Sequence, residues 1–220
     1  MYTTGVGIPE AQRTGLVKLL NASLAEAIDL ALQAKQAHWD IKGPHFIALH
    51  ELFDQVVAMA IEHGDNLAER AVQLGGRTEG TLQQVAKASH LKPFPTDLAE
   101  GLATVSALAA SVAAYANAAR AAIAHADGLG DPATADLYTQ SVREADKLLW
   151  FLEGHLQSAK YASPILGIIR RAPAEMPGLF EWAASRAALN SASRPQGSQS
   201  RVTALAVDPC PPLKPRATTK

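Results

Sequence analysis

The sequence is poor in cysteine and in aromatic residues. Its single cysteine, Cys210, excludes an intrachain disulfide framework and is typical of a reducing compartment. Aromatic residues make up only 5% of the chain, and the abundance of alanine and leucine favours helices over sheets. The first residues lack the basic-then-apolar pattern of a signal peptide, and no uninterrupted apolar run reaches about 20 residues. We therefore expect a cytoplasmic protein without a membrane span.

The net charge of −1 conceals two regions of opposite sign. Residues 1–161 carry 12 Lys and Arg against 18 Asp and Glu, a net charge of −6. Residues 162–220 carry 8 Lys and Arg against 3 Asp and Glu, a net charge of +5. They also hold 8 of the 13 prolines, so we expect a basic, Pro-rich and largely disordered extension behind an acidic domain.

Apolar residues at steps of three and four predict long helices in the first region. Four helices are expected, over residues 9–37, 45–74, 96–126 and 132–161. Gly75-Gly76 is a strong stop for the second helix, and Asp131 before Pro132 is a good N-cap for the fourth. A short helix is expected in the long link between the second and third helices. The predicted fold is all-α, a four-helix bundle with one crossover over residues 1–161.

The second predicted helix carries four potential metal ligands on one stripe. At about 100° per residue, His50, Asp54, Asp65 and Glu69 fall within about 100° of one another. A solvated acidic face is the simpler interpretation of such a stripe. However, Ala58 and Ile61 interrupt it, and His38 lies just ahead of the turn that returns the chain to His50. Imidazole and carboxylate together suit iron, manganese or zinc.

The length of this stripe has a consequence for assembly. His50 and Asp65 are 15 positions apart, which corresponds to about 22 Å along a helix axis. Two metals in one centre lie only about 3.5–4 Å apart. One chain therefore cannot gather the whole set, whereas two antiparallel copies about a two-fold axis can. Asp65 and Glu69 of one copy would then meet the histidines and Asp54 of the other.

The same residues resemble a known family. The segments KQAHWDIKGPHF, LHELFD and DNLAERAVQLGG, together with TADLYTQSVREADKLLWFLEGHLQ in the fourth helix, are similar to the Dps proteins, mini-ferritins of the ferritin-like superfamily. The resemblance covers about residues 10–160. It implies a ferritin-like bundle and a dodecamer with a di-iron ferroxidase centre at each two-fold interface. There Fe(II) is oxidised, preferably by hydrogen peroxide, and the ferric mineral is stored in the cavity, which protects DNA from oxidative damage.

Carried onto this sequence, the resemblance assigns the iron ligands as His38, His50, Asp54, Asp65 and Glu69. Trp39 aligns with an aromatic residue beside the centre that supplies an electron to quench radicals. Asp136 matches an acid of the iron-entry pore, although a first-turn acid favoured by the helix dipole explains it equally well.

The sequence also predicts the positions or contacts of several other residues. Arg70, beside Glu69, is expected to form an ion pair near the centre or across the interface. His63 lies away from the ligand stripe and is expected at the surface or an interface. Trp150 and Phe151 are expected in the core.

The sequence departs from the family at its N-terminus. Its first 17 residues hold one arginine and no lysine, so the lysine-rich tail with which many members bind DNA is missing. The basic residues from 162 onward are the alternative DNA-binding segment, with binding that falls steeply with salt. The competing functional hypotheses are an iron-oxidising storage enzyme, a nucleoid-associated DNA-compacting protein with secondary iron chemistry, and a plain helical interaction module.

Overall fold

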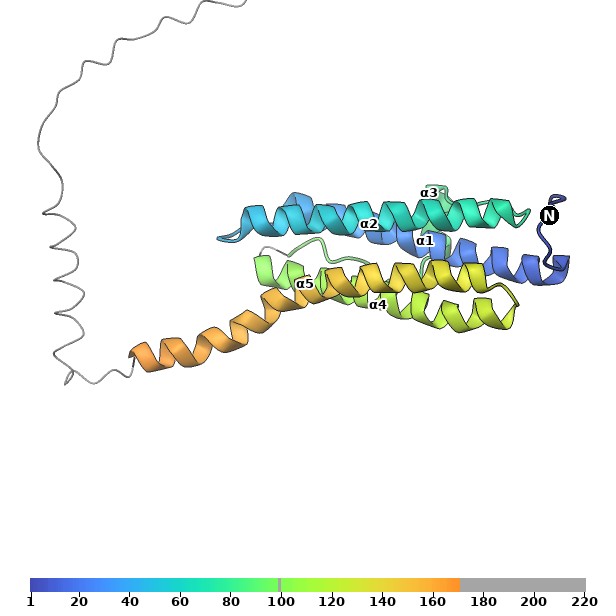
Figure 1. The fold of residues 1–220 in the computed structure, drawn as a ribbon. Coiled ribbons are helices and arrows are strands. Elements are labelled where there is room, and N and C mark those ends of the chain that lie inside the picture. Colours follow the sequence, from blue (N-terminus) through green and yellow to red (C-terminus); the bar gives the residue numbers. More distant parts are fainter. Residues whose placement is uncertain (99, 171–220) are drawn as a thin grey trace, which may run out of the picture. The chain divides into compact units, whose positions relative to one another are not determined.

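The computed structural model describes residues 1–98 and 100–170, with side chains described as far as residue 157. The described part is all-α, with the helices α1 (Glu10–Asp40), α2 (Phe46–Gln73), α3 (Leu82–Ala88), α4 (Gly101–Gly128) and α5 (Pro132–Arg170) (Figure 1). The chain divides into two units, residues 1–168 and 169–220. The predicted disorder of the basic extension falls mostly outside the described residues.

The four long helices pack in two antiparallel pairs, α1 with α2 and α4 with α5 (Figure 1). Contacts across the bundle join the pairs, including the bond from Tyr138 on α5 to Ser23 on α1. The short helix α3 lies in the crossover, as predicted, and packs against α1. The predicted four-helix bundle is confirmed, although α5 continues to Arg170, past its expected end near residue 161.

Specific residues explain the end of α2 and the start of α5. Gly75 follows α2 with a φ of +83°, a conformation that glycine adopts without strain. The N–H groups of Gly75 and Gly76 donate to Val72 and Ala71 at 2.8 and 2.9 Å, which is the Schellman pattern. The bond from the Thr134 N–H to Asp131 Oδ1 at 3.3 Å confirms Asp131 as the predicted N-cap of α5.

The core lies between the helices and combines large side chains on some positions with alanines on others. The largest fully buried residues include Leu16, Leu20, Phe53, Leu108, Tyr115 and Tyr138. Helix α4 contributes many small residues to this core, including Ala109, Ala116, Ala119, Ala122 and Ala126. These alanines let the neighbouring helices approach closely.

Helix α4 is the one described helix that is long and apolar enough to cross a membrane by length and composition, with a mean hydropathy of 1.4 over its most apolar window. Ten of its residues are buried in the bundle. The apolar character of α4 is therefore that of a core helix.

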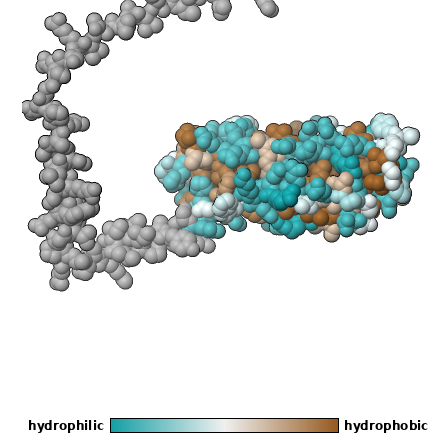
Figure 2. All heavy atoms as spheres, viewed as in Figure 1, coloured by the Kyte–Doolittle hydropathy of each residue, from teal (hydrophilic) through white to brown (hydrophobic). Residues whose placement is uncertain are grey.

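The surface of the body is mainly hydrophilic on the face shown in Figure 2, with apolar side chains scattered between polar ones. One aromatic residue departs from its predicted position. Trp150 on α5 is 64% exposed, so its expected place in the core is wrong. Its neighbour Phe151 is half-buried and packs against the core. Successive positions on a helix point about 100° apart, so the two rings do not share one environment.

Candidate metal centre

His38 and His50 meet at one end of the α1–α2 pair. Their rings stack with centroids 3.5 Å apart and planes 24° from parallel. His38 Nδ1 lies 2.9 Å from the carbonyl oxygen of His50, and His50 Nδ1 lies 2.9 Å from the carbonyl oxygen of His38. A carbonyl oxygen only accepts hydrogen bonds, so Nδ1 carries the proton in both rings. The lone pair of each neutral ring is then on Nε2.

These Nε2 atoms are available to a ligand. Neither Nε2 of His38 or His50 has a hydrogen-bond partner among the described residues. No buried side-chain nitrogen or oxygen in this part of the chain lacks a partner, so both Nε2 atoms reach the surface. Metal-binding histidines usually have their second nitrogen held by a backbone carbonyl or a carboxylate. The two rings have that arrangement.

Asp54 lies beside His38 and is the third predicted ligand at this end of the helix pair. Its Oδ1 is 3.2 Å from His38 Nδ1 and accepts a hydrogen bond from Lys35 Nζ at 2.7 Å. The Lys35 ammonium holds the pKa of the Asp54 carboxyl below its usual range, with partial burial opposing the effect. The carboxylate is therefore charged at neutral pH, as a metal ligand requires.

Asp65 and Glu69 lie one helical turn apart further along α2. Both are exposed, and neither forms an ion pair or hydrogen bond with a described residue. No group of three or more His, Cys, Asp or Glu side chains in the described chain is arranged to hold a metal. The predicted ligands thus lie in two separate candidate half-sites of one chain, His38 with His50 and Asp54, and Asp65 with Glu69, and neither by itself is arranged to hold a metal.

An apolar groove of about 790 Å³ adjoins the second half-site on the same α1–α2 face. Its lining includes Ile28, Leu32, Ala58, Ile61 and Asp65. Leu32 is 51% exposed and Ile61 is 60% exposed, which is unusual for large aliphatic side chains that lie next to each other. Exposed apolar surface of this kind is typical of a protein–protein interface.

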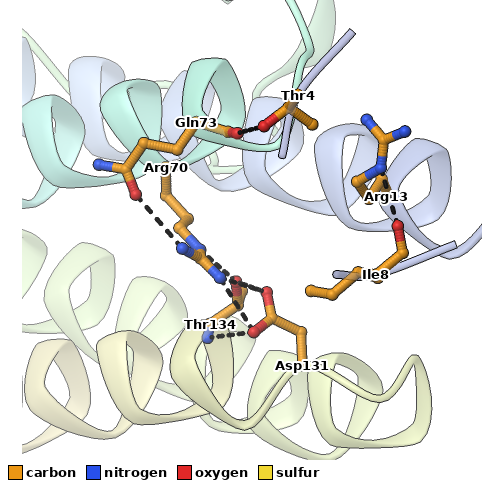
Figure 3. Close-up of polar contacts among 7 residues, drawn as sticks. All are labelled: Thr4, Ile8, Arg13, Arg70, Gln73, Asp131 and Thr134. Atoms are coloured by element: carbon orange, nitrogen blue, oxygen red, sulfur yellow. Dashed lines mark hydrogen bonds and ion pairs between the residues drawn. The ribbon is translucent and has the colours of Figure 1, made fainter. Parts of the chain in front are cut away.

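The remaining predicted site residues are exposed or form contacts elsewhere. Trp39 directly follows His38 and is 64% exposed. Asp136 is exposed in the second turn of α5. Arg70 forms its ion pair within the chain: its Nη2 donates to both oxygens of Asp131, at 3.0 and 2.8 Å, and its Nε donates to Thr134 Oγ1 at 3.0 Å (Figure 3). The guanidinium therefore fastens the end of α2, next to Glu69, to the start of α5.

His63 is buried within the chain, so its predicted position at the surface or an interface is wrong. Its side chain is 2% exposed, with Nδ1 3.1 Å from the Tyr115 hydroxyl and Nε2 2.8 Å from Glu144 Oε2. The signal for burial was present in the sequence, since His63 shares a helical face with Val56, Ala60 and Leu67. The Tyr115–His63–Glu144 chain joins α4, α2 and α5, and sequence reasoning missed it because the partners are far apart in sequence.

Known proteins that are similar to this chain identify its family. A family model described as a ferritin-like domain matches residues 17–162. A DNA protection during starvation protein of Agrobacterium fabrum is 47% identical over 156 residues, covering 71% of this chain and 96% of that protein.

Solved structures show the same fold. DpsA14 from Streptomyces coelicolor is similar with a TM-score of 0.67 at 33% identity, covering 70% of this chain and 91% of that one. Dps from Microbacterium arborescens, solved in a high iron form, has a TM-score of 0.63 at 31% identity, covering 69% of this chain and 97% of that one. The chain therefore belongs to the Dps family of ferritin-like proteins.

Proposed function

We propose that this protein is a mini-ferritin that oxidises Fe(II), preferably with hydrogen peroxide, at di-iron centres shared between two subunits. The ferric product is stored as a mineral inside a dodecamer, and DNA is thereby protected from oxidative damage. The protein acts in the cytoplasm. The iron ligands are His38, His50 and Asp54 of one subunit with Asp65 and Glu69 of its partner copy.

One observation supports this proposal: the exposed apolar groove between α1 and α2 is lined by Asp65, and the predicted ligands on these two helices are not gathered into one metal-holding group within the described chain. A second copy lying antiparallel on this face buries Leu32 and Ile61 and covers the groove. The same antiparallel placement brings Asp65 and Glu69 of one chain close to His38, His50 and Asp54 of the other. Burial of the groove thus provides the free energy that assembles the ligand set.

The chemistry of the side chains suits the reaction. The two Nε2 lone pairs and the carboxylates bind Fe(II) as a substrate, and the hard carboxylate oxygens favour the ferric product. The overall step is 2 Fe(II) + H₂O₂ + 2 H⁺ → 2 Fe(III) + 2 H₂O. Two irons at one centre supply both electrons to one peroxide, so no hydroxyl radical is released. Exposed Trp39, next to His38, is proposed to supply an electron to any one-electron oxidant that forms.

Asp136 is proposed to line the pore through which Fe(II) enters the shell. Its exposure on α5 leaves the carboxylate accessible to cations. The net charge of −6 on residues 1–161 supports the same route, because an acidic body attracts Fe(II) and binds ferric ions where the mineral begins.

Stopped-flow oxidation of Fe(II) by peroxide tests the site. His50→Ala and Asp65→Ala are expected to abolish the fast phase, because each removes a ligand from every centre. Glu51→Gln is the matched control: it removes an exposed carboxylate from α2 beside His50 and is expected to leave the rate unchanged. Wild-type rates in both ligand variants contradict the assignment.

Mixing the two inactive variants tests whether the centre is shared. When His50→Ala and Asp65→Ala chains are co-assembled in equal amounts, half of the dimers are mixed, and each mixed dimer has one intact centre. About a quarter of the wild-type fast phase should therefore return. A centre built within one chain predicts no recovery.

The alternative is a DNA-compacting protein that uses the basic extension, with iron chemistry secondary. The +5 charge of residues 162–220 favours it, because twelve such segments on one shell would bind phosphates with high avidity. Gel-shift titrations with the full chain and with a chain that lacks residues 162–220 test it. Equal DNA affinity of the two proteins excludes the extension as the DNA-binding segment.

A further inference from the structure

A second cavity, of about 620 Å³, lies away from the proposed metal centre. It is formed by the N-terminal segment, the first half of α1, the loop after α2, and α3. None of its lining residues lines the apolar groove. Polar and charged residues contribute to the lining, namely Tyr2, Thr14, Lys18, Asn21, Arg77, Glu79, Lys87 and His90.

The walls of this cavity are held by specific hydrogen bonds. Asn21 on α1 fixes the loop after α2 from both sides: its Nδ2 donates to the Arg77 carbonyl at 2.9 Å, and its Oδ1 accepts from the Glu79 N–H at 2.9 Å. The Tyr2 N–H donates to the Gly75 carbonyl at 2.6 Å. A side chain at Gly75 would place its Cβ only 2.5 Å from the Tyr2 carbonyl oxygen. The N-terminal segment is therefore packed directly on the turn.

The charge of the cavity is opposite to that of the body around it. Lys18, Arg77 and Lys87 all line it, and none of them forms an ion pair within the described part of the chain. Glu79 is the one carboxylate in the lining. The side chains of the lining therefore carry a charge of about +2 before His90 and the Met1 ammonium are counted, in a domain of net charge −6. Clustered cations without counter-charges are characteristic of anion-binding sites.

Arg77 is also oriented by its surroundings. Its guanidinium carbon lies 5.2 Å from the centroid of the Tyr2 ring, within the range of a cation–π contact. This contact limits the motion of a long side chain before any ligand arrives, which lowers the entropic cost of binding. A planar guanidinium binds two oxygens of a phosphate at once, while lysines at positions 18 and 87 add point charges.

We propose that this cavity binds a phosphate group, either free phosphate or a phosphate of a nucleic-acid backbone. Free phosphate matches the cavity better than carboxylate does, since its charge of about −1.5 to −2 offsets the lining cations more fully. A backbone phosphodiester carries one charge, so its binding there depends on the bidentate guanidinium contact. The site is independent of the proposed iron chemistry. If its ligand is the DNA backbone, the four-helix body itself contacts DNA.

Calorimetric titration of the iron-free full chain with sodium phosphate tests the proposal, with sodium acetate as the monovalent comparison. Arg77→Gln and Lys87→Gln are each expected to weaken phosphate binding about tenfold, the effect of losing one charge-assisted hydrogen bond. Lys42→Gln is the matched control, because it removes an exposed lysine that does not line the cavity. The absence of saturable phosphate binding, or equal effects of Lys42→Gln and Arg77→Gln, overturns the proposal.

Duplex DNA binding by the same full-length variants identifies the source of the phosphate. A loss of DNA affinity in Arg77→Gln, with a smaller dependence on salt concentration, supports a backbone phosphate. Unchanged DNA affinity together with weakened phosphate binding supports free phosphate. Iron oxidation by Arg77→Gln should equal that of the wild type, so this test and that of the metal centre can fail separately.

Discussion

The ion pair between Arg70 and Asp131 should contribute much more stability than the pair between Arg120 and Asp146. The two pairs have nearly the same geometry, because in each one guanidinium nitrogen contacts both carboxylate oxygens at 2.7–3.0 Å. They differ in burial: the side chains of Arg70 and Asp131 are 17% and 3% exposed, against 47% and 44% for Arg120 and Asp146. The comparison therefore isolates the effect of burial on an ion pair.

The expected magnitudes follow from this difference. Asn caps a helix about as well as Asp, so Asp131→Asn preserves the N-cap and removes the charge. It leaves the Arg70 charge buried without its partner, which costs about 3 kcal/mol, at the lower end of the usual range because Gln73 and Thr134 still accept hydrogen bonds from Arg70. Asp146→Asn breaks an exposed pair and should cost less than about 1 kcal/mol.

Urea unfolding at one fixed protein concentration measures both values, since the stability of an oligomer depends on concentration. Equal destabilisation by Asp131→Asn and Asp146→Asn would refute the reasoning.

The stability that the Arg70–Asp131 ion pair contributes also depends on pH. Burial raises the pKa of Asp131, but hydrogen bonds from Thr134 and Arg70 outweigh it and hold the pKa below its usual range. The folded-state pKa is depressed, so this stabilisation is present above about pH 4 and is lost as pH falls through the folded pKa.

Three further predictions concern other contacts. Tyr115→Phe should destabilise the protein by about 1–3 kcal/mol, seen as a lower urea midpoint, because His63 Nδ1 loses its buried partner; an unchanged midpoint contradicts this network. Gly75→Ala should lower the melting temperature and increase proteolysis of the N-terminal segment, since both the positive φ and the Tyr2 carbonyl oppose a side chain there. Trp39→Phe should leave stability within about 0.5 kcal/mol of the wild type, while altering the radical signals seen by electron paramagnetic resonance after peroxide addition; identical signals exclude Trp39 as the electron donor.

Local sequence signals predicted the helices and their ends well, because caps depend on a few neighbouring residues. Gly75 and Asp131 are examples in which residue type alone determines a turn. The end of α5 was less predictable: the proline content after residue 162 suggested an earlier stop, but no proline between Pro132 and Pro164 interrupts the helix. Pro164 lies within α5 as the structure describes it.

The site residues show where sequence reasoning stops. Angular spacing identified the stripe that carries His50 and Asp65, because this depends only on the helical repeat. The reciprocal bonds between His38 and His50 could not be predicted, since they depend on how α1 and α2 approach each other. The same applies to the partners of His63, because its position on the apolar face of α2 indicates burial but does not say which helices cover that face. Contacts between residues on different helices can be predicted only when the packing of the helices is known.

Asp131 takes part in two helix ends at once: α4 ends at Gly128, Leu129 and Gly130 follow, and α5 begins at Pro132. Its N–H donates to Ala126 on α4 at 3.2 Å, while its side chain caps α5. Fraying of either end therefore disturbs the other, so the amide protons of both helix ends should exchange with solvent in one shared opening event. Loops commonly absorb inserted residues, but this junction has no such tolerance, and even one added residue would separate the two roles that Asp131 performs.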